Sequence, residues 1–237
     1  MYGLLPPSEF IPLAEPTGLM GPLTRHVLDL ALAQSRWWRD RNLDITVAVN
    51  ISARNLHFTE LQDDITMLLA KWEVPPTALE LEVTESAIMA DPRRATEVLE
   101  SLNALGIKTI VDDFGTGHSS LAYLKRLPVS QLKIDGAFVA NMATDDEDAA
   151  IVSSTIDLAR SLGLSVVAEG VESESVWHQL RELGCPFAQG FYLSRPLLGD
   201  QMTRWLERHN STSHDDADVA AVTRMVSLAG VSARRAR

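Results

Sequence analysis

Short apolar segments alternate with longer segments of helical periodicity along this chain, and this alternation constrains the fold more than any other feature. Residues 45–49 form an apolar run typical of a buried strand, and residues 20–39 before it repeat apolar side chains at helical spacing. The same pairing recurs, and strands are predicted at residues 45–49, 79–83, 108–111, 132–134, 165–168 and 188–193. Strands separated by helices indicate right-handed crossovers and a parallel sheet.

A polar residue stands at the carboxyl end of every predicted strand. These residues are Asn50, Glu82, Asp112 with Asp113, Lys133, Glu169 and Gln189. In a parallel barrel the carboxyl ends of the strands converge on one face, which is where active sites lie. A solvated loop residue is the ordinary interpretation for any one of them, but six in series favour a shared site.

Four of these residues offer oxygen ligands to a metal ion. Asn50, Glu82, Asp112 and Asp113 are hard donors, and no cluster of histidines or thiolates accompanies them, which favours magnesium or manganese over zinc. Asp112 and Asp113 would point to opposite sides in a regular strand, but the chain turns at a strand end and both can face one site. One carboxylate could then bridge two ions, as two-metal hydrolysis of a phosphodiester requires.

The two remaining charged residues of the series suggest how such a reaction would proceed. Lys133 follows a buried leucine, so it is predicted to hold a water or a phosphate oxygen rather than to extend along the surface. Glu169 follows an apolar strand and is the candidate general base. Glycines in the turn at residues 113–117 permit positive φ and close approach of the backbone to a ligand.

Composition excludes several classes of function. The 237 residues carry a net charge of −11, which argues against a general surface for nucleic-acid polymers or anionic membranes. The single Cys185 cannot form an intramolecular disulfide, and no apolar run approaches the ~18 residues that span a bilayer. We therefore expect a cytoplasmic protein without a membrane segment.

At these motifs the chain resembles the EAL-domain family of cyclic di-GMP phosphodiesterases. The resemblance runs from about Gly3 to Leu206. The matching segments occur in the family's order at residues 3–15, 49–53, 81–86, 112–121, 132–135, 168–172 and 188–190.

The resemblance implies a TIM-like (β/α) barrel that hydrolyses cyclic di-GMP to linear pGpG with two Mg²⁺ or Mn²⁺ ions. It assigns metal binding to Asn50, Glu82, Asp112 and Asp113, the attacking water to Lys133 and Glu169, and support of the site to Glu172 and Gln189. It also implies that Glu85 anchors the loop at residues 113–120, which in this family couples the metal site to formation of a homodimer.

The chain departs from the family's pattern at its beginning. The family opens with two strands, of which the second carries the Glu-Ala-Leu motif with a metal-binding glutamate and, shortly after it, a phosphate-binding arginine. The motif occurs nowhere in these 237 residues. The predicted fold is thus an α/β barrel of the EAL type without its first two strands, spanning residues 1–210, with a flexible tail at residues 211–237. A misplaced start codon or truncated gene, a decayed enzyme, and a fragment completed by another chain would each explain the difference.

Two other functions remain open at this stage. The absent ligand would suit a catalytically inactive module that binds cyclic di-GMP or a partner protein without hydrolysis. An enolase-like lyase also gathers carboxylates at strand ends, although it lacks an Asp-Asp-Phe-Gly turn at this spacing from Lys133.

Overall fold

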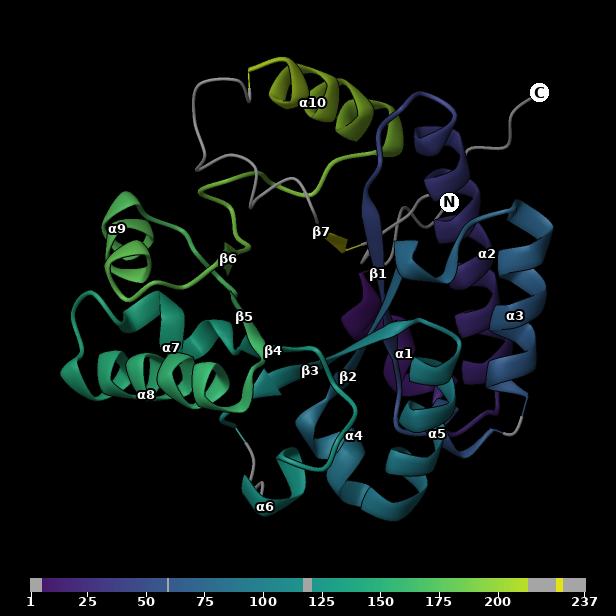
Figure 1. Ribbon diagram of the computed structural model, residues 1–237, viewed down its shortest axis with the longest axis horizontal. Helices are drawn as coiled ribbons and strands as arrows, with labels where there is room; N and C mark the ends of the chain where they lie inside the picture. Colours follow the sequence, from purple (N-terminus) through teal and green to yellow (C-terminus); the bar gives the residue numbers. More distant parts are fainter. Residues whose placement is uncertain (1–5, 59, 117–120, 213–224, 228–237) are drawn as a thin grey trace.

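The chain forms one curled parallel sheet with helices packed along it (Figure 1). A computed structural model describes residues 6–58, 60–116, 121–212 and 225–227. The strands are β1 Thr46–Ile51, β2 Leu79–Thr84, β3 Lys108–Phe114, β4 Gln131–Ile134, β5 Ser165–Ala168, β6 Phe187–Ala188 and β7 Met225–Ser227. Their order in the sheet is β6-β5-β4-β3-β2-β1-β7, and every pair is parallel. The predicted TIM-like α/β architecture is confirmed as a half-barrel.

Helices occupy the crossovers between strands, as the alternation of the sequence predicts. They are α1 Pro7–Ala14, α2 Met20–Arg39, α3 Leu61–Trp72, α4 Glu85–Ala90, α5 Pro92–Ala104, α6 Leu121–Leu124, α7 Gly136–Asn141, α8 Asp146–Leu162, α9 Glu174–Glu182 and α10 Gly199–Thr212, with 3₁₀ turns at Asn55–His57 and Pro76–Ala78. Side-chain caps fix where several of them begin: Asp135, Asp145 and Ser173 each accept a hydrogen bond from the first turn of the helix that follows. Gly163 ends α8 in the left-handed conformation that glycine adopts without strain.

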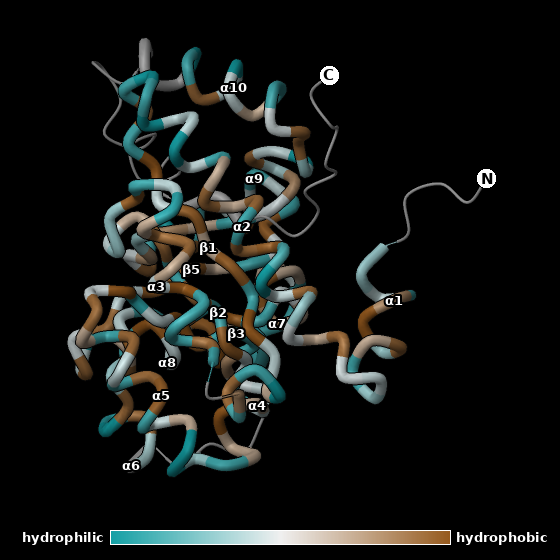
Figure 2. Tube along the Cα trace, turned by 90° about the vertical axis from the view of Figure 1, so that its right-hand side faces the viewer, coloured by the Kyte–Doolittle hydropathy of each residue, from teal (hydrophilic) through white to brown (hydrophobic). Residues whose placement is uncertain are grey.

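The apolar core lies between the sheet and these helices. Figure 2 shows the hydrophobic strands at the centre of the molecule and more hydrophilic segments on the outer helices. β2 is buried along nearly its whole length, as expected for a parallel strand covered on both faces. None of the described helices is both long enough and apolar enough to cross a membrane.

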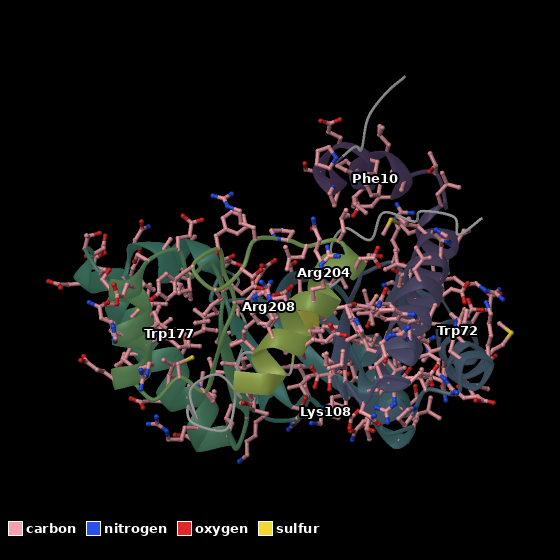
Figure 3. The ribbon with its side chains drawn as sticks, turned by 90° about the horizontal axis from the view of Figure 1, so that it is seen from above. Phe10, Trp72, Lys108, Trp177, Arg204 and Arg208 are labelled. Carbon is pink, nitrogen blue, oxygen red and sulfur yellow. The ribbon has the colours of Figure 1, made fainter. Side chains whose placement is uncertain are left out.

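The two ends of the chain lie at different places around this core. Helix α1, which carries Phe10, stands away from the body of the molecule in Figures 2 and 3. Helix α10 lies near the amino end of β1. Trp38 is at the end of α2, shortly before β1, and its Nε1 donates a hydrogen bond to Thr203 Oγ1 in α10 at 2.9 Å. The carboxyl ends of the strands are therefore at the opposite end of the sheet from α10.

The segment predicted to be a tail begins within helix α10 and contains strand β7. Helix α10 continues to Thr212, past the predicted domain boundary at residue 210. Within the segment expected to be a flexible tail, Met225–Ser227 pairs with β1 in parallel. Residues 213–224 and 228–237 lie outside the described part of the chain.

Candidate active site

Strand register places the polar strand ends on one face of the sheet. Asn50 pairs with Glu82, Thr84 pairs with Asp112, and Lys133 pairs with Val167, so these neighbours share a face. Residues two apart on a strand also share a face, which adds Glu169 after Val167. The predicted convergence is thus a consequence of the register.

A β-bulge aims the two adjacent aspartates into the same space. The register between β3 and β4 shifts between Val111 and Phe114, and Asp113 adopts a φ of 53°, in the left-handed region. The Asp113 amide also donates to Asp112 Oδ1 at 3.1 Å, which holds the reversal of direction. As a result, carboxylate oxygens of Asp112, Asp113 and Glu169 all lie within 4.8 Å of one another.

Lys133 lies at the centre of the buried carboxylates. Its Nζ is 3.1 Å from Glu82 Oε1, 3.2 Å from Asp112 Oδ1 and 2.5 Å from Glu169 Oε1. The side chain of Lys133 is 3% exposed and that of Glu82 is 0% exposed. Both Glu82 oxygens lack a partner with hydrogen-bond geometry among the described residues, so the contact with Lys133 is an ion pair.

Burial governs the protonation of this cluster. Desolvation raises the pKa of Glu82, Asp113 and Glu169 above the ordinary values, and the positive charge of Lys133 opposes the shift. Burial by itself would lower the pKa of Lys133, but Glu82, Glu169 and Asp112 together raise it. Lys133 therefore carries its positive charge beside Glu82 and Glu169, two acids whose pKa is raised by burial.

These shifts predict the pH dependence of metal binding. A cation requires ionised carboxylates, and carboxyl groups with a raised pKa ionise only at higher pH. Mn²⁺ affinity should therefore rise with pH as Glu82, Asp113 and Glu169 lose their protons. Calorimetric titrations with Mn²⁺ across a buffer series from acid to neutral pH would test this, and an affinity that falls with pH would contradict it.

The turn after the two aspartates is held by Glu85. Glu85 is buried at the start of α4, and its Oε2 accepts a hydrogen bond from the Gly115 amide at 3.0 Å. Thr116 closes the turn, because its Oγ1 donates to the Asp113 carbonyl at 2.9 Å. Residues 117–120 of the loop that Glu85 is predicted to anchor lie outside the described part of the chain.

Three predicted site residues are not buried with the cluster. Asn50, Glu172 and Gln189 are exposed. The backbone of Gln189 is nevertheless fixed, because its amide donates to the Ala168 carbonyl at 2.8 Å and its carbonyl accepts from the Val171 amide at 3.1 Å. The structure thus brings the buried residues of the series together and leaves these three at exposed positions.

Gly190 allows the segments after β5 and β6 to lie against each other. A Cβ on Gly190 would lie 2.2 Å from the Val171 carbonyl oxygen and 2.3 Å from the Val171 nitrogen, distances that real Cβ atoms do not reach. Gly190→Ala should separate the two segments and lower the free energy of unfolding by about 1–3 kcal/mol. Thermal melting would measure this. Gly21→Ala, in helix α2, is the matched control and should change stability little. Its new Cβ would lie 3.5 Å from the Phe58 ring, which is an ordinary contact distance.

Two further acidic residues of this region lie outside the series predicted from the sequence. Asp135 caps α7, and its charge contributes to the raised pKa of Asp113. Glu80 lies two residues before Glu82 on the same face of β2, is buried, and has a pKa raised by desolvation. Spacing was the available signal, because Glu80 and Glu82 are two apart and Asp135 is two residues after Lys133.

Comparison with known proteins agrees with the geometry of this site. A model of the EAL domain family matches residues 2–196. The bifunctional diguanylate cyclase/cyclic di-GMP phosphodiesterase MucR of Pseudomonas aeruginosa is 46% identical over 202 residues, which cover 85% of this chain and 30% of MucR. Cyclic di-GMP phosphodiesterase PA2567 of the same organism is 38% identical over 206 residues, which cover 87% of this chain and 35% of that protein.

A solved structure shows the same fold. The PaMucR phosphodiesterase in complex with c-di-GMP superposes with a TM-score of 0.82 at 46% identity, over 85% of this chain and 82% of that chain. The chain spans about a third of the length of the curated relatives named above. The half-barrel, the ordered strand-end residues and the family match agree, and the chain belongs to the EAL domain family.

Proposed function

We propose that this chain hydrolyses cyclic di-GMP to linear pGpG as a metal-dependent phosphodiesterase. The observation that carries the proposal is the buried group of Glu82, Asp112, Glu169 and Lys133 at the carboxyl ends of the strands, with the Asp113 carboxylate beside it. Relatives named as cyclic di-GMP phosphodiesterases, and a relative whose structure holds c-di-GMP, support this choice of substrate.

The donor set fits a hard divalent cation. Asp112, Asp113 and Glu169 offer carboxylate oxygens within 4.8 Å of one another, and the buried Oε2 of Glu82 has no hydrogen bond within the described structure. We infer that Asp112, Asp113, Glu82 and Asn50 hold Mg²⁺ or Mn²⁺. When bound, the metal would stabilise charge on the phosphodiester and favour ionisation of the attacking water.

Glu169 would accept a proton from the attacking water, and Lys133 would supply a positive charge beside it. Glu169 has a raised pKa through burial, so it is suited to accept a proton from the attacking water at neutral pH. Lys133 contacts Glu169 Oε1 at 2.5 Å, which fixes the direction of that carboxylate. The ammonium group also keeps a positive charge beside the position where a phosphate oxygen would lie.

Several finer expectations belong to the same proposal. Two metal ions, rather than one, would divide stabilisation of the attacking and the leaving oxygens. Gln189 and Glu172 would support the site from its rim, and Glu85 would anchor the turn at Gly115. A homodimer formed through the loop at residues 113–120 completes the proposal, and light scattering of the purified chain measures it.

The direct test is turnover by the 237-residue chain itself. Cyclic di-GMP is incubated with the chain and Mg²⁺ or Mn²⁺, and the products are separated by anion-exchange chromatography. We expect pGpG to accumulate only when a divalent ion is present. Asp157→Asn, which alters an exposed carboxylate on α8, is the control that should turn over normally. A folded chain that binds cyclic di-GMP and releases no pGpG would overturn the proposal in favour of a non-hydrolysing binding module.

A further inference from the structure

The turn that carries Asp113 has a backbone conformation that needs external support. Asp113 has a φ of 53° and Gly115 a φ of 103°, so two of three consecutive residues lie in the left-handed region. Such conformations cost about 1–3 kcal/mol for a residue with a side chain, and they persist only where surrounding contacts hold them. The position of the Asp113 carboxylate therefore depends on what packs against this turn.

Two contacts hold Gly115. Its amide donates to Glu85 Oε2 at 3.0 Å. The ring of Phe138 also lies close to Gly115, because a Cβ on Gly115 would be only 3.2 Å from Phe138 Cε2. The backbone at Gly115 therefore has both a hydrogen bond and an aromatic ring against it.

Phe138 is itself fixed to the strand that carries Lys133. It lies in α7, directly after β4, and its amide donates to the Asp135 carbonyl at 3.2 Å. Asp135 also caps α7 by accepting from the Ala137 amide at 2.7 Å. The ring is half-buried and packs on the apolar core. Phe138 thus joins the end of β4 to the turn at the end of β3.

We propose that Phe138 is a positioning residue, whose ring holds the turn at Asp113–Gly115 and so sets the place of the Asp113 carboxylate relative to Lys133. The proposal rests on the proposed function in one respect only, namely that the ligand bound by the Asp113 carboxylate is a metal ion. The ring acts on the Asp113 carboxylate through Gly115 and not by touching the reacting groups. The support it gives is therefore measurable without substrate.

Hydrogen exchange at the turn tests the proposal in the full chain. The Gly115 amide is bonded to a buried carboxylate and should exchange slowly. Phe138→Leu keeps an apolar side chain but removes the ring, and exchange of the peptide spanning residues 113–116 should become roughly ten-fold faster. Phe138→Tyr is the conservative variant. It keeps the aromatic ring, so exchange at residues 113–116 should remain slow.

A matched control separates positioning from general loosening of the fold. Met142→Ala removes a buried side chain just after α7 and should leave exchange at residues 113–116 unchanged. Unchanged exchange in Phe138→Leu would overturn the proposal, as would equal acceleration in Met142→Ala. If Phe138→Leu does not fold, Phe138→Met takes its place, because its unbranched, flexible side chain fills an irregular space more easily, and it should likewise accelerate exchange at residues 113–116.

Calorimetric titration with Mn²⁺ measures whether the loss of the ring also weakens metal binding. Its outcome separates the role of Phe138 from the proposed function. Phe138→Leu should weaken Mn²⁺ binding by about 10–100-fold, the range found when support of a metal ligand is lost. Faster exchange with unchanged Mn²⁺ affinity would overturn the link between the ring and the carboxylate. An unaltered chain that takes up no Mn²⁺ would count against the metal-dependent function, while the exchange experiment would still decide the role of Phe138.

Discussion

Lys133→Met should lower the free energy of unfolding by about 3–5 kcal/mol at neutral pH and abolish turnover. The reason is that the ammonium group contacts three carboxylates, and the side chain of Glu82 among them is 0% exposed. Removing one partner of a buried ion pair leaves an uncompensated charge in an environment of low polarity. Chemical denaturation of the variant and of the unaltered chain, both without metal, measures the difference.

The pH dependence of this loss gives a second measurement. Desolvation raises the pKa of Glu82 and Glu169 in the folded protein above the unfolded values. Such a group destabilises the fold above its folded pKa, and the cost is relieved as the pH falls through that pKa and the group takes up a proton. The destabilisation caused by Lys133→Met should therefore shrink in acid. A loss of the same size at all pH values would contradict this electrostatic account.

A divalent cation should partly replace the missing ammonium group. Mn²⁺ bound at Asp112 and Asp113, close to Glu169, would restore positive charge, so it should raise the melting temperature of Lys133→Met more than that of the unaltered chain. Lys71→Met is the matched control, because Lys71 pairs with Asp29 at the surface with half its side chain exposed. Exposed pairs contribute about 0–1 kcal/mol, so this control should change little.

Periodicity made much of the fold predictable. The helix expected at residues 20–39 is α2 with the same bounds, and the strand expected at residues 165–168 is β5. A helix of 20 residues repeats its apolar face over several turns, so its pattern is hard to mistake. The polar residue at each strand end was also informative, because a parallel sheet places all carboxyl ends on one edge.

Features that depend on neighbouring segments were not predictable. Helices α4 and α7 have six residues each, too few to show a period, and β6 is only Phe187–Ala188 where a strand to residue 193 was expected. The bulge at Asp112–Asp113 depends on how β3 pairs with β4, and the exposure of Asn50 depends on what lies beside β1. The pairing of β7 with β1 joins segments far apart in sequence, which local patterns do not encode.

Glu169→Gln should reduce turnover by about 10²–10⁴-fold while leaving the protein folded. The amide keeps the size of the carboxylate and can still accept a hydrogen bond from Lys133, but it cannot take a proton from the attacking water. The side chain is 22% exposed, so the loss of its charge should disturb stability much less than the loss of Lys133. Initial rates of pGpG formation and thermal melting measure the two effects side by side.

Comparison of the two variants distinguishes a proton acceptor from a structural carboxylate. If Glu169 accepts the proton, Glu169→Gln should lose activity across the whole pH range, while its Mn²⁺ affinity should stay close to normal, because Glu169 is not among the proposed metal ligands. If Glu169 only neutralises Lys133, the amide should retain most of the activity, because Glu82 and Asp112 still contact that ammonium group. Near-normal turnover by Glu169→Gln would thus contradict the proposal that Glu169 is the base.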